Sequence, residues 1–233
     1  KGYVSHEQLT QAQSVISEGK QLAVQQGYSE LLIQLLQTQA VLFRQQGQLD
    51  EALSLLKEAK QAADALGNAL LSAQTSYELA VILFFQGQYQ QAIDLTRGAL
   101  KEFRTANQQQ WQGKALNILG ILYGSQGRMD ESLDSMMQAL EIAKQQNDHN
   151  TWQALLNNVG VTLDRLEKLP EALAIYQEAL DLAIQLQDMR SEALALINIG
   201  MVHTSLEQLD FAERFFSKGI DLAATLSDLS LQA

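Results

Sequence analysis

The chain has 233 residues, of which 16 are Lys or Arg and 27 are Asp or Glu, so its formal net charge is −11. Such an acidic chain repels phosphate, which argues against direct binding to nucleic acid or to an anionic membrane surface. The lack of cysteine excludes disulfides, thiolate metal sites and a cysteine nucleophile, and a single proline argues against an all-β fold with many tight turns.

Five segments of the sequence align without gaps at a spacing of 40 residues. They read QGQLDEALSLLKEA, QGQYQQAIDLTRGA, QGRMDESLDSMMQA, LEKLPEALAIYQEA and LEQLDFAERFFSKG, starting at residues 46, 86, 126, 166 and 206. Their apolar and small residues recur at the three- and four-residue spacing of an amphipathic helix. A register that is kept over five copies indicates a repeat protein.

In chain order, this register predicts one helix over about 5–26 and then two-helix units over about 28–67, 68–107, 108–147, 148–187 and 188–227. Residues 228–233 are expected to start a further helix. Neither end carries the polar capping helix that a stacked array needs, and the first residue is Lys. We therefore expect a single solenoid over 1–233 that is a fragment of a longer protein.

Each unit is expected to be a helix hairpin. The first helix ends near Gly47, Gly87 and Gly127, because glycine suits the left-handed residue that ends a helix. The second helix begins near Asp50 or, in one copy, near Pro170, and both residue types suit a first helical turn. Capping residue types mark the seams before the next unit, at 67–68, 107–108, 147–148, 187–188 and 227–228.

Small residues occupy matching columns of the two helices. Ala or Gly stands at 40, 80, 120, 160 and 200, and Ala or Ser stands at 52, 92, 132, 172 and 212. We expect these columns to face each other, so that the two backbones of a hairpin approach closely. Each hairpin is apolar on more than one face and must stack on its neighbour.

The pattern resembles the tetratricopeptide repeat, which has a small residue and an aromatic residue in the first helix and Ala–Leu in the second. One copy carries it as Gly120, Tyr123, Gly127, Met129, Ser132, Leu133 and Ala139. The usual period is about 34 residues, so the longer period here resembles the branch with the kinesin light chain, the Leu-Gly-Asn polarity adaptors and many bacterial signalling proteins. The Trp that is typical near the start of the first helix is absent at that position. The resemblance implies an all-α fold, a right-handed superhelix (α-solenoid) of antiparallel helix hairpins.

The resemblance also implies a peptide-binding groove, because in this family the first helices line the concave side and the second helices form the outer wall. Carried over to this chain, the groove falls on positions in the first helix of each repeat. The candidate groove residues are Gln37, Arg44, Tyr77, Val81, Lys114, Asn117, Ile121, Asn157, Asn158, Val161, Asn198 and Met201.

Asparagine is unusual in the body of a helix, yet Asn117, Asn157, Asn158 and Asn198 lie mid-helix in adjacent repeats. A carboxamide both donates and accepts hydrogen bonds, so a row of them can hold a peptide backbone. The strings NNVG and INIG resemble the Asn-bearing first helices with which the kinesin light chain and the polarity adaptors grip peptides. The alternative is that these residues bond across neighbouring helices and only fix the stacking of the repeats.

The other candidates also have two interpretations. Arg44 and Lys114 are expected to pair with acidic groups of a ligand. Lys114 has no basic counterpart at Gln74 or Ala154, which argues against the clamp by which some family members bind chaperone tails. Apolar pockets between the amides, or ordinary packing between repeats, are the two interpretations of Val81, Ile121, Val161 and Met201.

No catalytic or metal-binding pattern is present in the sequence. His6, His149 and His203 are scattered without the spacing of metal ligands; we expect His149 to be solvated at a seam and His203 to be packed. Glycine-rich phosphate loops and the nucleophile elbow are missing. We therefore expect no enzymatic activity and no cofactor.

The function expected from these observations is non-catalytic binding of a protein or peptide ligand, in a cytoplasmic protein that contacts neither nucleic acid nor membrane directly. No apolar run reaches the roughly 20 residues of a membrane span, and no signal peptide opens the sequence. Two alternatives stay open. One is a regulatory sensor domain that controls an output domain of a larger, bacterial signalling protein. The other is a structural spacer or a module that self-associates through its open ends.

Overall fold

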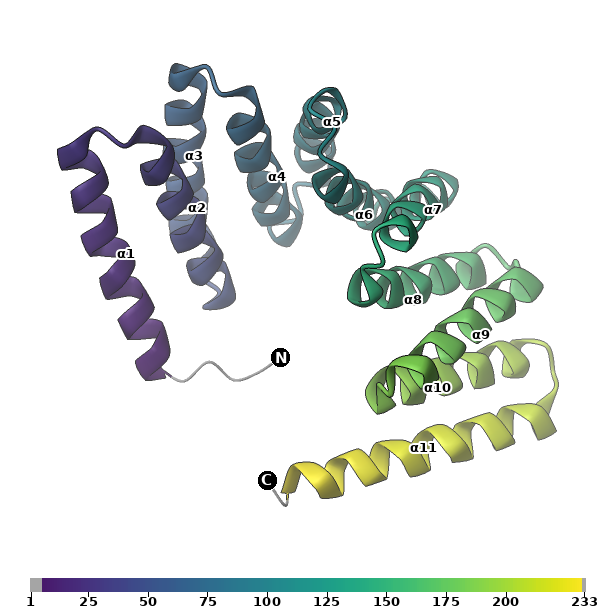
Figure 1. Cartoon of the computed structure of the whole chain (residues 1–233). Coiled ribbons are helices and arrows are strands. Elements are labelled where there is room, and N and C mark those ends of the chain that lie inside the picture. The colour runs from purple at the N-terminus through teal and green to yellow at the C-terminus, as the bar shows by residue number, and fades with distance from the viewer. Residues whose placement is uncertain (1–5, 232–233) are drawn as a thin grey trace. The chain divides into compact units, whose positions relative to one another are not determined.

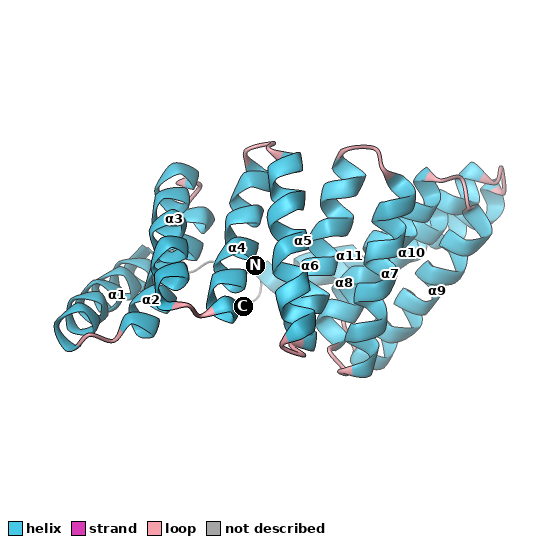
Figure 2. Ribbon diagram, turned by 90° about the horizontal axis from the view of Figure 1, so that it is seen from above, coloured by secondary structure: helices cyan, strands magenta, loops and turns pink. Residues whose placement is uncertain are grey.

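A computed structural model describes residues 6–231 of the chain, with side chains described over 11–226. Within that range the chain forms helices and no strand, which confirms the predicted all-α class (Figure 2). No helix of this described part is long and apolar enough to cross a membrane. The helices are α1 (His6–Gln26), α2 (Ser29–Gln45), α3 (Leu49–Leu66), α4 (Ala69–Phe85), α5 (Tyr89–Thr105), α6 (Gln109–Ser125), α7 (Met129–Gln145), α8 (His149–Arg165), α9 (Leu169–Leu186), α10 (Met189–Ser205) and α11 (Leu209–Leu231).

The chain divides into two compact units, Lys1–Leu122 and Tyr123–Ala233, here called unit 1 and unit 2. Within each unit, consecutive helices are antiparallel neighbours joined by short connections (Figure 1). The even-numbered helices α2, α4, α8 and α10 are the first helices of the predicted hairpins, and α6, which contains the division between the units, is another. First helices also contact one another, α2 with α4 in unit 1 and α8 with α10 in unit 2.

A left-handed residue ends a helix every twenty residues along the chain, and this regular spacing is the main local feature of the fold. Glycine fills five of these positions, including the predicted Gly47, Gly87 and Gly127, with φ between 70° and 79°. Asn107, Asn147, Glu167, Gln187 and Glu207 fill the other five, with φ between 53° and 60°. At Gly47, for example, the following N–H of Gln48 donates to the carbonyl of Phe43 at 2.9 Å, which satisfies a terminal helix acceptor.

Side-chain caps start three of the first helices. The side chain of Asn68 accepts from the backbone N–H of Leu71 at 3.0 Å, and that of Asp148 accepts from Thr151 at 3.1 Å. Asp188 caps α10 in the same way. These caps confirm the expectation for three of the predicted seams, and proline lies in the first turn of α9 as expected.

The seam expected at 227–228 is not a helix boundary. α11 continues without a break from Leu209 to Leu231, so the start of a further helix at 228–233 is wrong for the part of that segment that is described. The physical reason is local: the SD pair is a weak stop signal, because neither glycine nor asparagine offers a left-handed residue there.

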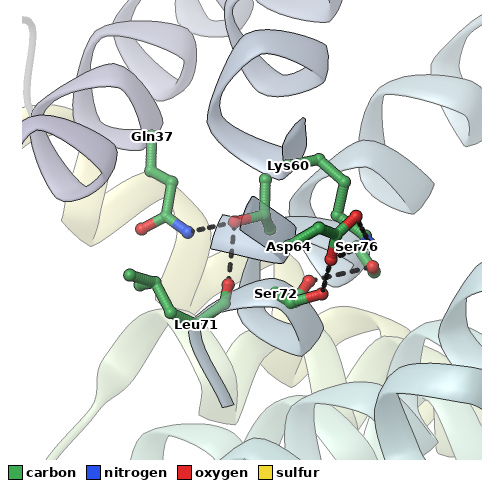
Figure 3. Close-up of polar contacts among 7 residues, drawn as sticks. Gln37, Lys60, Asp64, Leu71, Ser72 and Ser76 are labelled. Carbon is green, nitrogen blue, oxygen red and sulfur yellow. Dashed lines mark hydrogen bonds and ion pairs between the residues drawn. The ribbon is translucent and has the colours of Figure 1, made fainter. Parts of the chain in front are cut away.

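Aliphatic side chains between α2, α3 and α4 form one part of the core of unit 1, and α5 adds the fully buried Phe103. Ala40 and Ala52 share one buried cluster with Leu56, which agrees with the close approach of small residues in this hairpin. Polar contacts tie the same helices together (Figure 3). The hydroxyl of Ser72 on α4 donates to Asp64 on α3 at 2.6 Å, and Lys60 pairs with the same carboxylate at 2.6 Å.

In unit 2 the small residue of the first helix packs against an aromatic ring of the second. A Cβ atom placed on Gly160 would lie 2.6 Å from Cζ and 2.8 Å from Cδ1 of Tyr176. Gly200 stands in the same relation to Phe216, with ring carbons at 2.8 Å. The side chain nearest to Gly160 is thus a large ring sixteen residues later, and the ring fills the space that the missing Cβ leaves.

The left-handed ends predict opposite effects of two substitutions in unit 2. Glu167→Gly should stabilise unit 2 by about 1 kcal/mol, because a residue with a Cβ is disfavoured at positive φ. Gly127→Ala should destabilise it by about 1 kcal/mol for the same reason. Urea unfolding followed by Trp152 fluorescence, in a Trp111→Phe background, measures both; equal shifts in one direction would contradict the explanation.

The contact of Gly160 with Tyr176 predicts strong coupling between the two positions. Gly160→Ala should lower the free energy of unfolding of unit 2 by about 1–3 kcal/mol, because the added methyl group overpacks against the Tyr176 ring. Adding Tyr176→Leu recreates the Ala40 and Leu56 combination of unit 1, so the double variant should regain most of that loss. A double-mutant cycle by urea unfolding tests this, and additive losses would show that the ring does not set the requirement for glycine.

Candidate functional site

In unit 1, the predicted residue Gln37 is used within the fold. Its Nε2 donates to the hydroxyl of Thr75 at 2.7 Å, and that hydroxyl donates to the carbonyl of Leu71 at 2.8 Å (Figure 3). The bond joins α2 to α4, the first helices of neighbouring repeats. Gln37 therefore contributes to the stacking of repeats in this structure.

Aromatic and basic side chains gather on the first helices of unit 1. Tyr77 and Trp111 meet edge to face with their ring centroids 5.6 Å apart, and the ammonium of Lys114 lies 4.5 Å from the Trp111 centroid. Arg44 lies 5.9 Å from the ring of Phe85, and its Nε is buried without a hydrogen-bond partner among the described residues. Cation–π contacts of this kind hold both basic groups in place.

Glu78 on α4 gives this surface an acidic group between the two bases. Burial raises the pKa of the Glu78 carboxyl, and the charges of Arg44 and Lys114 oppose that rise. Burial and the charge of Glu78 also raise the pKa of Tyr77 to about 12. Glu78 therefore already lies close to Arg44 and Lys114. This carboxyl group competes with an acidic ligand group for the two bases and weakens the expected pairing between base and ligand.

The remaining predicted residues of unit 1 are largely enclosed. Val81 is only 9% exposed and belongs to the packed face of α4, which favours packing over a ligand pocket at that position. Ile121 is half-buried on α6. Asn117 is half-buried, and its Oδ1 is buried without a hydrogen-bond partner in the described part of the chain.

In unit 2, three of the predicted asparagines line one pocket. The pocket has a volume of about 390 Å³ and lies between α8, α9 and α10. Asn157 and Asn158 reach it from α8 and Asn198 reaches it from α10. Of the other predicted residues in this unit, Val161 is half-buried and Met201 is 52% exposed, and neither lines the pocket.

Two of the asparagines bond to each other. Nδ2 of Asn198 donates to Oδ1 of Asn157 at 2.7 Å, across the first helices of neighbouring repeats. For this pair the structure shows the bond that fixes stacking. The bond uses one N–H of Asn198 and the Oδ1 of Asn157, so it leaves the other N–H of Asn198 and both N–H groups of Asn157 for other partners. The side chain of Asn158 has no hydrogen bond among the described residues.

The second helix α9 and the seam before α10 complete the pocket. Sequence reasoning restricted to first helices missed Tyr176, Leu186 and Asp188 for that reason. It also missed Gln153 and Leu194, although each lies four residues before a predicted asparagine on the same helix face, which was a usable signal.

The polar groups of the pocket differ in how well they are satisfied. Nε2 of Gln153 donates to the carbonyl of Ala179 at 3.0 Å, whereas its Oε1 is buried with no partner in the described range. His149, expected to be solvated, is instead half-buried: it stacks on Trp152, and its Nδ1 is also buried without a described partner. The expectation for His149 was wrong because its ring packs on Trp152, three residues later in α8, rather than pointing into solvent.

Asp188 supplies the one carboxylate of the pocket lining. Its Oδ1 accepts from the backbone N–H of Arg190 at 3.1 Å and of Ser191 at 3.2 Å, and its Oδ2 accepts from the Ser191 hydroxyl at 2.6 Å. The hydroxyl bond first, and the backbone bonds after it, lower the pKa of Asp188, although burial opposes them. The group is therefore ionised at neutral pH.

Within the described residues, no group of three or more His, Asp or Glu side chains is placed to hold a metal ion.

A second hollow, of about 590 Å³, lies over α11. It is bordered by Ile220, which is 61% exposed, while the equivalent Leu180 on α9 is 7% exposed because α9 has a following helix against it. Self-association through this face stays a prediction.

Comparison with known proteins identifies the repeat. A model of the tetratricopeptide repeat matches residues 29–101, 71–145, 111–185 and 152–225, in overlapping copies that together extend over most of the chain. No curated protein matches the chain in sequence.

Solved structures with the same fold are distant in sequence. BtubC (BKLC) from P. vanneervenii has a TM-score of 0.84 at 19% identity, and the match covers 95% of this chain and 91% of that one. A STAND-type signal transduction ATPase with a tetratricopeptide repeat sensor, PH0952 from Pyrococcus horikoshii, has a TM-score of 0.77 at 16% identity, covering 92% and 34%. A Rap protein complexed with competence and sporulation factor has a TM-score of 0.66 at 16% identity, covering 86% and 55%.

Glu78 predicts a pH-dependent stability of unit 1. Since its folded-state pKa is raised, the folded state holds the proton more tightly than the unfolded state does, and stability falls as pH rises through the folded-state pKa. Glu78→Gln removes this loss, so it should stabilise unit 1 at pH 7 and have little effect at about pH 3.5, below the ordinary carboxyl range.

Urea unfolding followed by Trp111 fluorescence in a Trp152→Phe background measures this difference. Glu58→Gln, at an exposed position of α3, is the control and should show no such pH-dependent gain. A destabilised Glu78→Gln variant at pH 7 would mean that attraction to Arg44 and Lys114 outweighs burial.

Proposed function

We propose that this chain, which belongs to the tetratricopeptide repeat family, is a non-catalytic scaffold that binds a protein or peptide segment on its first helices. The observation that supports the proposal is the pocket of unit 2, in which Asn157, Asn158 and Asn198 converge from α8 and α10. A volume of about 390 Å³ suits one residue of a ligand with its flanking peptide groups.

The chemistry of the pocket fits a peptide backbone. Each peptide group carries one donor and one acceptor, and a carboxamide such as that of Asn158 supplies both. The Asn157–Asn198 bond holds two carboxamides in fixed positions before a ligand arrives, which lowers the entropy cost of binding. Asn157 and Asn198 thus act as preorganised ligand contacts, and Asn158 is the contact that the fold does not otherwise use.

The packing of the buried His203 is consistent with a binding protein that has no catalytic role. His203 is stacked between Phe211 and Phe215, with centroid distances of 5.4 Å to each, and its Nδ1 is 2.7 Å from Oε1 of Gln208. This packing gives His203 a structural role. The Rap protein of similar fold is complexed with competence and sporulation factor, which supports ligand binding as the function of such a solenoid.

A regulatory sensor is the second candidate. The ATPase from Pyrococcus horikoshii has a tetratricopeptide repeat sensor of the same fold. In a sensor, ligand binding to the pocket would have to favour one arrangement of the repeats over another, because a ligand that binds two states equally shifts nothing. A spacer, in contrast, would bind no peptide at all.

Selection from a phage-displayed random dodecapeptide library tests the scaffold. Peptides selected by the native protein should lose about tenfold or more in affinity for Asn158→Ala, because the buried backbone groups lose a partner. Gln185→Ala on α9, exposed and outside the pocket, should keep native affinity. Circular dichroism establishes that each variant is folded.

Asn157→Ala and Asn198→Ala are expected to behave differently from Asn158→Ala, because each also breaks the bond between α8 and α10. They should lower both the stability of unit 2 and peptide affinity. If no peptide is selected, or if Asn158→Ala and Gln185→Ala bind the selected peptides equally, the pocket is not the binding site.

A further inference from the structure

We infer that the unit 2 pocket selects a peptide segment with an aliphatic side chain next to a basic group, and that it rejects acidic segments. This inference rests on the proposed function and specifies its ligand. It is carried by two side chains of the pocket lining, the exposed Leu194 and the carboxylate of Asp188.

Leu194 supplies an exposed apolar contact at the pocket, whereas the exposed Met201, seven residues later on α10, does not line it. Leu194 lies in the pocket lining and is 46% exposed, next to Leu186, which is 37% exposed at the end of α9. Two leucines from two helices at one pocket form an anchor for an aliphatic side chain, which would bury both.

Comparison between repeats shows that packing does not demand this leucine. The positions that correspond to Leu194 at intervals of 40 residues hold Gln34, Gln74, Lys114 and Ala154. All five positions are on first helices and four of the five are exposed, with Gln74 half-buried. The stacking of repeats therefore tolerates a polar residue here, and the leucine of this repeat is explained by contact with a ligand.

Asp188 supplies a charge that helix capping does not require. The corresponding Asn68 caps α4 with a neutral carboxamide, since its side chain accepts from Leu71 at 3.0 Å. Asn and Asp are equally good N-caps. Capping alone thus does not demand a carboxylate, although Asp148 also caps α8 with one. Asp188 differs from Asp148 in that it lines the pocket.

No residue of the lining offsets the charge of Asp188, and Arg190 acts on Asp188 from outside the lining. The ionisable groups around the pocket are Asp188, His149 and Tyr176, and neither Lys nor Arg lines it. Burial first, and the charge of Asp164 after it, raise the pKa of Tyr176 to about 12, so its hydroxyl is neutral. Lys144 lies nearby on α7, but it is paired with Glu178 at 2.7 Å. A ligand carboxylate would lose water without gaining a cation of the lining, whereas an ammonium gains Asp188.

The test uses acetylated, amidated hexapeptides as a positional-scanning library, with one position fixed as Leu, Ala, Lys, Gln or Glu. Binding is measured by competition against a fluorescein-labelled peptide obtained by phage display. The native protein should prefer Leu over Ala by about tenfold at one position, as expected for a buried aliphatic side chain. At a neighbouring position it should prefer Lys over Glu by about three- to fivefold, the size of a single charge contact near a surface.

Two variants separate these preferences. Leu194→Gln, the residue of an equivalent position, should abolish the preference for Leu and leave that for Lys. Asp188→Asn keeps a cap of the Asn68 type and should bring the Lys to Glu ratio close to one, with the preference for Leu unchanged. Thermal unfolding of both variants should match that of the native protein.

The outcomes distinguish this inference from the proposed function. Peptides that need Asn158 for binding but show no preference for Leu or Lys would overturn the inference and leave the scaffold intact. A preference for Glu would overturn it as well. Failure of every hexapeptide and every displayed peptide to bind would remove the proposed function, and the inference with it.

Discussion

The twenty-residue interval between left-handed helix ends is the constraint on which the rest of the structure depends. Each helix and its connection occupy the same length of chain, so every first helix starts in the same phase as the one 40 residues earlier. Equivalent residues then lie on equivalent faces. For this reason Asn157 and Asn198, 41 residues apart, meet within hydrogen-bond distance on adjacent first helices.

The interval is kept even where the residue is unfavourable. Glycine and asparagine adopt positive φ at low cost, and they mark most of the helix ends in the first two thirds of the chain. Glu167 and Glu207 adopt it at a cost, because tertiary packing of the hairpins on either side fixes the path of the chain. Sequence reasoning predicted the ends at Gly47, Gly87 and Gly127 from glycine, and for the others it relied on the repeat register and the capping residue types at the seams.

The difference between residues with a local sequence signal and residues placed by tertiary packing also explains how much of the site was predictable. Asn157, Asn158 and Asn198 were identified because an amide in the body of a helix is a local anomaly. Asp188 was recognised only as a cap, and Tyr176 only as part of the repeat pattern, since neither has a local signal that points to a pocket. Their approach to α8 depends on packing between helices, as does the Gly160 contact with the Tyr176 ring, which no spacing within one helix reveals.

Repeats provide an internal control for function, because each position has counterparts in the same fold. Where counterparts agree, as with the small residues of the hairpins, the fold accounts for the residue. Where one repeat departs from the others without need, as at Leu194, we infer contact with a ligand. Unit 1 illustrates the contrast, since Gln37 is used in stacking and Lys114 is held on Trp111.

The most direct test of this account is a titration of ¹⁵N-labelled protein with a phage-selected peptide, observed through the side-chain NH₂ signals of asparagine. The account predicts that the signals of Asn157, Asn158 and Asn198 shift together, with one apparent affinity, and that the signal of Asn107, an exposed helix end in unit 1, stays unchanged. Saturable peptide binding that leaves these three signals unmoved would contradict it and direct attention to another surface of the chain.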